Sequence, residues 1–271
     1  MTTRDTPRDT PDGPGAQGTQ GAPDASGGAG RVANAADAGT AGTTATTAST
    51  QQTVRVGAGN VQLEGTLTVP PGARGVVLFA HGSGSSRHSP RNRFVAGELQ
   101  RGGLATLLID LLTADEEAVD LRTRHLRFDI GLLAERLVGA TDWLAQHPQT
   151  EALRVGYFGS STGGGAALVA AAERPEAVGA VVSRGGRPDL AGAALPRVTA
   201  PTLLIVGGDD VPVIGMNREA LAQMTACAVK RLEIVPGATH LFEEPGKLAE
   251  VARLARDWLA TYLAGRQQRA A

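Results

Sequence analysis

The chain has 271 residues, of which 42% are hydrophobic, and its 26 basic and 27 acidic residues give a net charge of −1. This balance argues against a nucleic-acid-binding surface or a polybasic membrane patch. No apolar run is long enough for a membrane span, and no secretory signal is visible. The single cysteine, Cys227, rules out an internal disulfide and a multi-cysteine metal site. We therefore expect a cytoplasmic protein with no nucleic-acid partner.

The first 52 residues differ in composition from the rest of the chain. They are mostly Gly, Ala, Thr, Asp and Pro, with one Val and no Leu, Ile or aromatic residue. Such a segment cannot bury enough apolar surface to offset the entropy lost on ordering. We expect residues 1–52 and the C-terminal tail, 266–271, to be disordered, and residues 53–265 to form one domain.

The predicted elements begin with two strands that alternate apolar and polar residues, at 54–56 and 61–69. Continuous apolar runs follow, as in strands covered on both faces. These predicted strands are 75–80, 105–111, 154–159, 177–182 and 201–207, with a last, more alternating strand at 229–235. The predicted helices between them are 93–101, 126–146, 162–172, 218–224 and 248–263. This alternation predicts an α/β fold, a mostly parallel twisted sheet with helices on both faces.

Two connections between these elements bear on access to a site. Fewer than about 20 residues separate the strands at 177–182 and 201–207, which is too short for a lid domain. The charged stretch 115–127 reads as a solvated loop that leads into a helix, with no chemical role. We expect an open site for small or accessible substrates.

A nucleophile-elbow pattern lies at 159–163, where GSSTG matches G-x-S-x-G between an apolar strand and a small-residue helix. In that setting a sharp turn lifts the central hydroxyl, here of Ser161, to the helix N-terminus. A register centred on Ser160 would need glycines at the positions of Phe158 and Thr162. We predict Ser161 as the nucleophile, and a Gly/Ser turn without chemical meaning is the alternative.

A serine nucleophile needs a general base and a carboxylate that orients the base. His240 follows the last predicted strand, where a loop can bring its ring over the carboxyl edge of the sheet. His81 ends the first buried strand and suits another role. The strand LLIVGG runs into Asp209 and Asp210. The order Ser161, Asp210, His240 is the chain order of such triads. We predict Asp210 as the acid, with Asp209 or simple helix capping as alternatives, and a surface loop histidine as the alternative for His240.

An acyl-transfer site also needs two hydrogen-bond donors for the oxyanion. The backbone N–H of Thr162, directly after the nucleophile, is one candidate. The loop HGSGSS at 81–86 follows the first buried strand, and its glycines allow close approach to a substrate. We assign the second donor to the N–H of Ser83, with Gly82 as the neighbouring alternative and a plain Gly/Ser turn as the other interpretation.

Four segments in this order carry a family resemblance over about residues 53–265. They are FAHGSGSSRHSPRNR (79–93), YFGSSTGGGAAL (157–168), LLIVGGDDVPVI (203–214) and PGATHLFEEPG (236–246). The chain resembles an α/β-hydrolase and, within that fold, the dienelactone hydrolase family. The resemblance implies a Ser–Asp–His triad, no metal and no organic cofactor. Dienelactone hydrolases proper use a cysteine nucleophile, and Ser161 stands in its place here, which puts dienelactone itself in doubt as the substrate.

Two arginines follow strand ends at the edge where open α/β sheets place ligands. Arg87 follows the oxyanion loop, and Arg184 follows the strand at 177–182. Because a guanidinium binds carboxylate or phosphate well, either could bind an anionic substrate group. Ordinary loop arginines are the alternative, including a salt bridge from Arg184 or Arg187 to Asp189.

These features together predict a serine hydrolase that cleaves ester-type, lactone or thioester bonds of small, optionally anionic substrates through an acyl-enzyme. Two other functions remain open at this stage. One is a non-catalytic ligand-binding protein on the same fold, since fold does not fix function. The other is an acyltransferase that uses the same triad.

Overall fold

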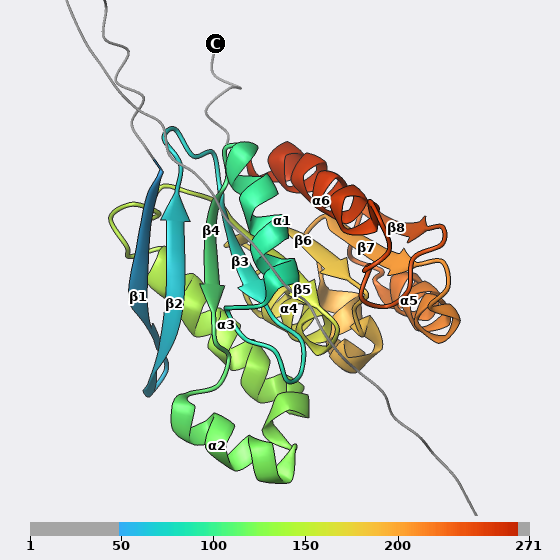
Figure 1. Cartoon of the computed structure of the whole chain (residues 1–271), viewed down its shortest axis with the longest axis horizontal. Coiled ribbons are helices and arrows are strands. Elements are labelled where there is room, and N and C mark those ends of the chain that lie inside the picture. Colours follow the sequence, from blue (N-terminus) through green and yellow to red (C-terminus); the bar gives the residue numbers. More distant parts are fainter. Residues whose placement is uncertain (1–48, 265–271) are drawn as a thin grey trace, which may run out of the picture. The chain divides into compact units, whose positions relative to one another are not determined.

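The computed structural model describes residues 49–264 (Figure 1). The disorder predicted for most of residues 1–52, and for 266–271, lies outside the described residues. Residues 50–52 are an exception, because the first strand, β1, spans Thr50–Ala58. Its Thr50 is paired with Val69 of the next strand, so the predicted boundary at 52 falls three residues too late.

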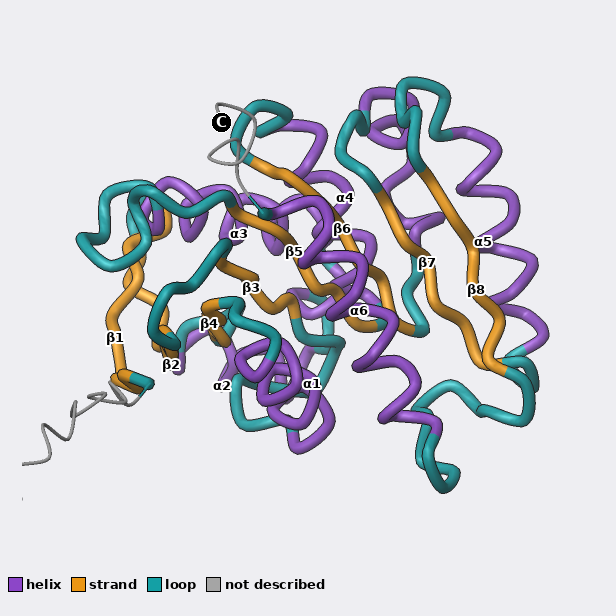
Figure 2. Tube along the Cα trace, turned by 90° about the horizontal axis from the view of Figure 1, so that it is seen from above, coloured by secondary structure: helices purple, strands orange, loops and turns teal. Residues whose placement is uncertain are grey.

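Eight strands form one sheet in the order β1-β2-β4-β3-β5-β6-β7-β8. Strand β2 pairs antiparallel with β1 on one side and with β4 on the other, and all remaining neighbours are parallel. Figure 2 shows the strands crossing the domain from β1 on one side to β8 on the other. After β1, the strands are β2 Val61–Val69, β3 Val76–Ala80, β4 Ala105–Ile109, β5 Val155–Ser160, β6 Val178–Arg184, β7 Thr202–Gly207 and β8 Lys230–Val235.

Helices cover both faces of this sheet, as the alternating pattern predicts. One hydrophobic core lies under α3, α4 and α5, and the other lies under α1 and α6. The helices are α1 Pro90–Arg101, α2 Ala114–Thr123, α3 Ile130–Leu144, α4 Thr162–Glu173, α5 Val211–Gln223 and α6 Lys247–Leu263, with short 3-10 segments η1 Leu126–Phe128 and η2 Pro188–Arg197. The predicted α/β class is confirmed.

Strand β5 shows how the sequence serves both cores. Tyr157 belongs to the core under α3 and α4, whereas Phe158 belongs to the other core and packs on Phe79 with ring centroids 5.0 Å apart. The Tyr157 hydroxyl is hydrogen-bonded to Thr141 Oγ1 at 2.6 Å, and burial raises the pKa of this phenol. With the hydroxyls of Tyr157 and Ser160 both partnered, β5 can run through the centre of the domain and end directly before Ser161.

Helices α2, α3 and α5 differ most from the sequence prediction. The stretch read as a solvated loop forms α2 and η1, and Thr113 and Glu116 close a capping box at the start of α2. The long helix predicted from 126 therefore begins only at 130, where Asp129 caps it. Helix α5 begins at Val211, seven residues before the predicted helix. The connection from β6 to β7 holds only η2, in agreement with the predicted absence of a lid domain there. Between residues 49 and 264, no helix is long and apolar enough to cross a membrane.

Candidate active site

Ser161 sits on a strained turn between β5 and α4. Its φ of 49° and ψ of −122° lie in a backbone region that residues other than glycine rarely adopt. A Cβ on Gly159 would lie 2.6 Å from the carbonyl oxygen of Gly163, and one on Gly163 would lie 2.2 Å from that of Ala80. The two glycines of the motif are thus needed for the turn. The hydroxyl of Ser160, the rival nucleophile, is buried and donates to Asn92 Oδ1 at 3.0 Å.

His240 and Asp210 are hydrogen-bonded at the same end of the sheet. Asp210 Oδ2 lies 2.6 Å from Nδ1 of His240. Asp210 occupies the N-cap position of α5 but makes no side-chain capping bond, so helix capping does not account for its carboxylate. Asp209 uses its backbone N–H to bond the Ala238 carbonyl. Of the two aspartates considered from the sequence, Asp210 is the one in contact with the imidazole.

The end of β6 places this pair beside Ser161. The backbone N–H of Ser161 donates to the carbonyl of Arg184 at 3.4 Å. The next residue, Gly185, has a φ of +50°, and a Cβ there would lie 3.5 Å from both Nδ1 and Cε1 of His240. The imidazole of His240 therefore packs against Gly185, the residue after Arg184, whose carbonyl accepts the hydrogen bond from Ser161. Three side chains far apart in sequence come to one edge of the sheet.

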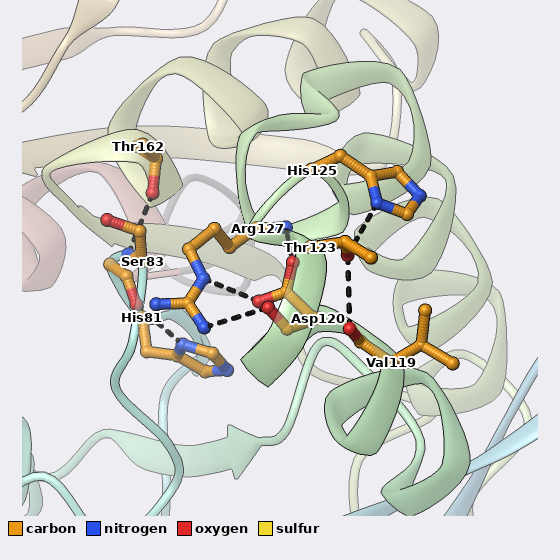
Figure 3. A network of polar contacts seen from close by, with 9 residues as sticks. His81, Ser83, Val119, Asp120, Thr123, His125, Arg127 and Thr162 are labelled. Carbon is orange, nitrogen blue, oxygen red and sulfur yellow. Dashed lines mark hydrogen bonds and ion pairs between the residues drawn. The ribbon is translucent and has the colours of Figure 1, made fainter.

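The predicted oxyanion loop, residues 81–86, approaches Ser161 closely. A Cβ on Gly82 would lie 3.1 Å from Ser161 Cβ, so this position has little room for a side chain. The N–H of Ser83 donates to Thr162 Oγ1 at 2.9 Å (Figure 3). The structure thus brings the predicted donor residues Ser83 and Thr162 together, but it bonds them to each other.

His81 holds the oxyanion loop to the end of β4. Its Nε2 accepts from the N–H of Leu111 at 3.1 Å, so its Nδ1 carries the proton and donates to the Gly82 carbonyl at 3.0 Å. Desolvation of the enclosed ring lowers the pKa of His81, although Asp110 and Glu117 oppose this shift. The neutral ring can therefore hold the Gly82 carbonyl of the loop against the Leu111 N–H that follows β4.

A small pocket with a cavity volume of about 30 Å³, partly open to solvent, lies between the oxyanion loop and the segment 112–128. Arg127 and Asp120 from that segment line it together with Thr162. In Figure 3 the Arg127 side chain lies between Asp120 and the oxyanion loop. A Cβ on Gly84 would lie 3.3 Å from Arg127 Nη1. The sequence interpretation assigned no role to this charged segment, and the capping box pattern from Thr113 was the signal that could have revealed its helix.

Asp120, one of the residues of segment 112–128 that line the pocket, is only 2% exposed. It accepts hydrogen bonds from the Arg127 backbone N–H at 3.1 Å and from the guanidinium. Burial acts to raise the pKa of Asp120, but these hydrogen bonds outweigh it and lower the pKa. The charge pair fixes α2 to η1 at the mouth of the pocket.

The two arginines proposed for anion binding differ in their surroundings. Arg87 forms ion pairs with Asp110 and with Glu64. Arg184 is 7% exposed, and its Nε and Nη1 have no hydrogen-bond partner within residues 49–264. Burial and the charge of Arg91 lower the pKa of Arg184 to about 10. The salt bridge to Asp189 that could have explained these loop arginines is made by Arg187 instead, at 2.7 Å.

Comparison with known proteins gives relatives of two kinds. Among solved structures, a dienelactone hydrolase from Anabaena variabilis is 68% identical with a TM-score of 0.77, and the match covers 79% of this chain and 99% of that one. Est1E from Butyrivibrio proteoclasticus is 16% identical with a TM-score of 0.64, covering 79% and 99%. At that identity Est1E supports the fold alone.

Two curated proteins from Mycobacterium tuberculosis strains CDC 1551 and H37Rv, both named "Putative phosphoribosyl transferase", are 56% identical over 214 residues. The match covers 79% of this chain but only 47% of theirs, so the chain spans about half the length of these relatives. A family model, "Dienelactone hydrolase family", matches residues 63–263. The resemblance read from the four sequence segments is confirmed: the chain belongs to the dienelactone hydrolase family and has the α/β-hydrolase fold.

Proposed function

We propose that this protein is a serine hydrolase that cleaves ester-type bonds of small substrates, with Ser161 as nucleophile, His240 as base and Asp210 as acid. The observation that carries the proposal is the 2.6 Å contact between Asp210 Oδ2 and His240 Nδ1 at the sheet edge where Ser161 occupies a strained turn. Strain of that kind persists where the surrounding structure enforces it, and it is concentrated at active sites.

The hydrogen bond to Asp210 determines which imidazole nitrogen acts as the base. A carboxylate only accepts hydrogen bonds, so Nδ1 of His240 carries the proton and Nε2 is left to accept one. In the proposed reaction Nε2 takes the hydroxyl proton of Ser161 as Oγ adds to the carbonyl carbon. The proton then passes to the leaving alkoxide, and the acyl-enzyme forms. Water, deprotonated by the same nitrogen, releases the acid and restores Ser161.

Oxyanion stabilisation is proposed for the groups around Thr162. Its backbone N–H lies at the start of α4, where the first amides of a helix lack partners within the helix. The N–H of Ser83, the other predicted donor, is directed at the same residue. Because the Ser83 amide lies against Thr162, we keep Ser83 and Thr162 as the candidates for the oxyanion hole, rather than Gly82.

An anionic substrate group is proposed for Arg184 and no longer for Arg87, whose guanidinium is already paired with two carboxylates. A buried guanidinium without a partner is costly, and an anion next to it would relieve that cost. We expect Arg184→Met to raise KM for a carboxylate-bearing ester and to leave KM for a neutral ester unchanged. Arg187→Met, which removes a guanidinium already bonded to Asp189, is the matched control. An unchanged KM for the charged ester would end this assignment.

The two other functions considered from the sequence differ from the proposal in what they require of these residues. An acyltransferase would use the same residues but would pass the acyl group to an acceptor other than water. A ligand-binding protein without catalysis would not need the hydrogen bond between His240 and Asp210. The name carried by the mycobacterial relatives describes proteins of which this chain matches less than half, and no observation here favours phosphoribosyl transfer.

Active-site labelling and ester hydrolysis test the proposal together. Wild-type protein should react with a fluorophosphonate probe and should hydrolyse p-nitrophenyl esters of short acyl chains, and Ser161→Ala should abolish both. Asp210→Asn should lower kcat by about 10⁴, as loss of the acid does in other triads. Asp209→Asn should keep nearly full activity and serves as the adjacent control. Labelling that survives in Ser161→Ala would refute the proposed nucleophile.

A further inference from the structure

The amide expected to face the substrate is already occupied. The N–H of Ser83 donates to Thr162 Oγ1 at 2.9 Å, and this oxygen belongs to the residue directly after the proposed nucleophile. Either Thr162 must move away before a substrate carbonyl can use this amide, or the threonine hydroxyl itself faces the carbonyl. The two possibilities lead to opposite effects when the hydroxyl is removed.

The surrounding contacts hold the Ser83 amide where it is. The peptide that joins Gly82 to Ser83 has its carbonyl fixed by two donors, His81 Nδ1 at 3.0 Å and the N–H of Ser85 at 3.1 Å. His81 is in turn fixed by the N–H of Leu111. Since a peptide is planar, a fixed carbonyl also fixes the direction of the N–H on its other side. The oxyanion loop therefore keeps aiming its amide at Thr162.

The side chain of Thr162 is fixed too, but its proton is free. Thr162 is 3% exposed and lies in the first turn of α4, between Ser161 and three small residues, Gly163, Gly164 and Gly165. Its oxygen accepts from Ser83, and its hydroxyl proton has no acceptor within residues 49–264. A hydroxyl that accepts one hydrogen bond becomes a better donor of the next. Thr162 also lines the pocket beside the oxyanion loop, and it is the residue directly after Ser161.

We infer that the hydroxyl of Thr162 is a catalytic residue that donates a hydrogen bond to the developing oxyanion, with the Ser83 amide acting behind it. The inference rests on the proposed function of Ser161. As Ser161 Oγ bonds to the carbonyl carbon, the π electron pair of the carbonyl moves to its oxygen. That oxygen is met by the backbone N–H of Thr162 and by its O–H. The hydroxyl keeps its proton throughout, so no further acid or base is needed.

The inference predicts a loss that appears in catalysis rather than in binding. A donor that meets the oxyanion strengthens as charge develops, so its removal lowers kcat more than it alters KM. Loss of one oxyanion donor costs about 10²–10³ in kcat in other enzymes. If the hydroxyl were instead an obstruction that must leave, its removal would free the Ser83 amide for the substrate and would keep or raise kcat.

Thr162→Val and Thr162→Ser decide between the two. Valine keeps the shape and removes the hydroxyl, whereas serine keeps the hydroxyl and removes the methyl group. We expect Thr162→Val to lower kcat for a p-nitrophenyl ester by about 10² with KM changed less than threefold, and Thr162→Ser to retain at least a third of wild-type kcat. Thr106→Val is the matched control, because it removes a buried threonine hydroxyl that likewise accepts one hydrogen bond, from Gln100, away from the site.

A transition-state analogue gives a readout that a merely structural role would not move. The Ser161 oxygen adds to the ketone carbon of an aryl trifluoromethyl ketone, and the ketone oxygen becomes an oxyanion. Thr162→Val should therefore weaken inhibition by this compound by about the factor lost in kcat. Equal inhibition and an unchanged or higher kcat in Thr162→Val would overturn the inference. If Thr162→Val does not fold, a low kcat for Thr162→Ser would overturn it as well, because that variant keeps the hydroxyl.

Fluorophosphonate labelling separates this inference from the proposed function. Wild-type protein that is labelled at Ser161, together with a Thr162→Val variant as active as wild type, would overturn only the role of the Thr162 hydroxyl. Absence of labelling and of esterase activity in wild type would overturn the proposed function first, and the inference with it.

Discussion

At the scale of single residues, the site combines groups held by strain with groups held by hydrogen bonds. Ser161 owes its place to a turn that only glycine neighbours permit, as the 2.2 Å approach of a Cβ on Gly163 to the Ala80 carbonyl shows. His81 owes its place to two hydrogen bonds that suit only its neutral form, with the proton on Nδ1. The turn has no titratable group, whereas the His81 contact depends on a ring that can bind a proton.

The His81 contact predicts an acid-sensitive component of stability. Desolvation lowers the pKa of His81 in the folded protein. Above the ordinary histidine pKa of about 6.5 both states are neutral and the group has no effect. As pH falls below that value, the unfolded chain binds a proton first, so the free energy of unfolding decreases until the folded pKa is reached.

Urea unfolding at several pH values between 7.5 and 5 measures this component. The fall in the free energy of unfolding should be shallower in His81→Asn than in wild type, because the variant lacks the group that titrates. His88→Asn, which changes an exposed histidine two residues beyond the oxyanion loop, is the control. Parallel slopes in all three proteins would contradict the prediction.

At the scale of elements, sequence patterns located the strands better than the helices. Continuous apolar runs mark β3 to β7 within one or two residues, because strands buried on both faces need apolar residues at every position. Helix α2 was missed because half of its residues are charged and Asp120 is its single buried residue. The start of helix α5 was predicted too late because Pro212 and Gly215 weaken the helical signal in the sequence of its first turns. Proline is nevertheless well tolerated in the first turn of a helix.

The missed helix is also the wall of the pocket, and its attachment can be tested. Asp120→Asn removes the charge that meets the Arg127 guanidinium and weakens the acceptor for the Arg127 backbone N–H. We expect the free energy of unfolding to fall, as when a polar group loses its partner. KM for small esters should rise, since Arg127 lines the pocket.

Asp115→Asn on the exposed side of the same helix is the control for this change, because it removes a charge of the same sign without touching the pocket. Chemical denaturation and ester kinetics on both variants provide the comparison. If Asp120→Asn were as stable and as active as Asp115→Asn, the segment 112–128 would not depend on this charge pair.

At the scale of the whole molecule, the sequence specified the architecture and predicted which residues would meet at one edge of the sheet, but not their contacts. Chain order and strand ends predicted that Ser161, Asp210 and His240 would reach one edge, since parallel strands end together. Adjacent aspartates at 209 and 210 could be separated only by the turn that follows β7. The bond between Ser83 and Thr162 joins residues 79 positions apart, and no local pattern encodes it.

The contacts of strand β1 predict where truncation begins to matter. Strand β1 pairs with β2 along its whole length, from Thr50 to Ala58, and Val56 and Ala58 are fully buried. The Ala58 carbonyl also accepts from Arg136 on α3 at 3.2 Å. Deleting residues 1–48 should therefore leave esterase activity and Tm unchanged.

Deleting residues 1–58 should instead lower the free energy of unfolding by more than about 3 kcal/mol, since it uncovers a core edge and leaves a buried guanidinium with one fewer acceptor. The unpaired edge of β2 should also promote aggregation. Thermal denaturation and light scattering on the two truncated proteins measure both effects. A loss of stability on removing 1–48 alone would show that the residues before β1 contribute contacts to the fold, and an unaltered Tm without β1 would contradict its place in the core.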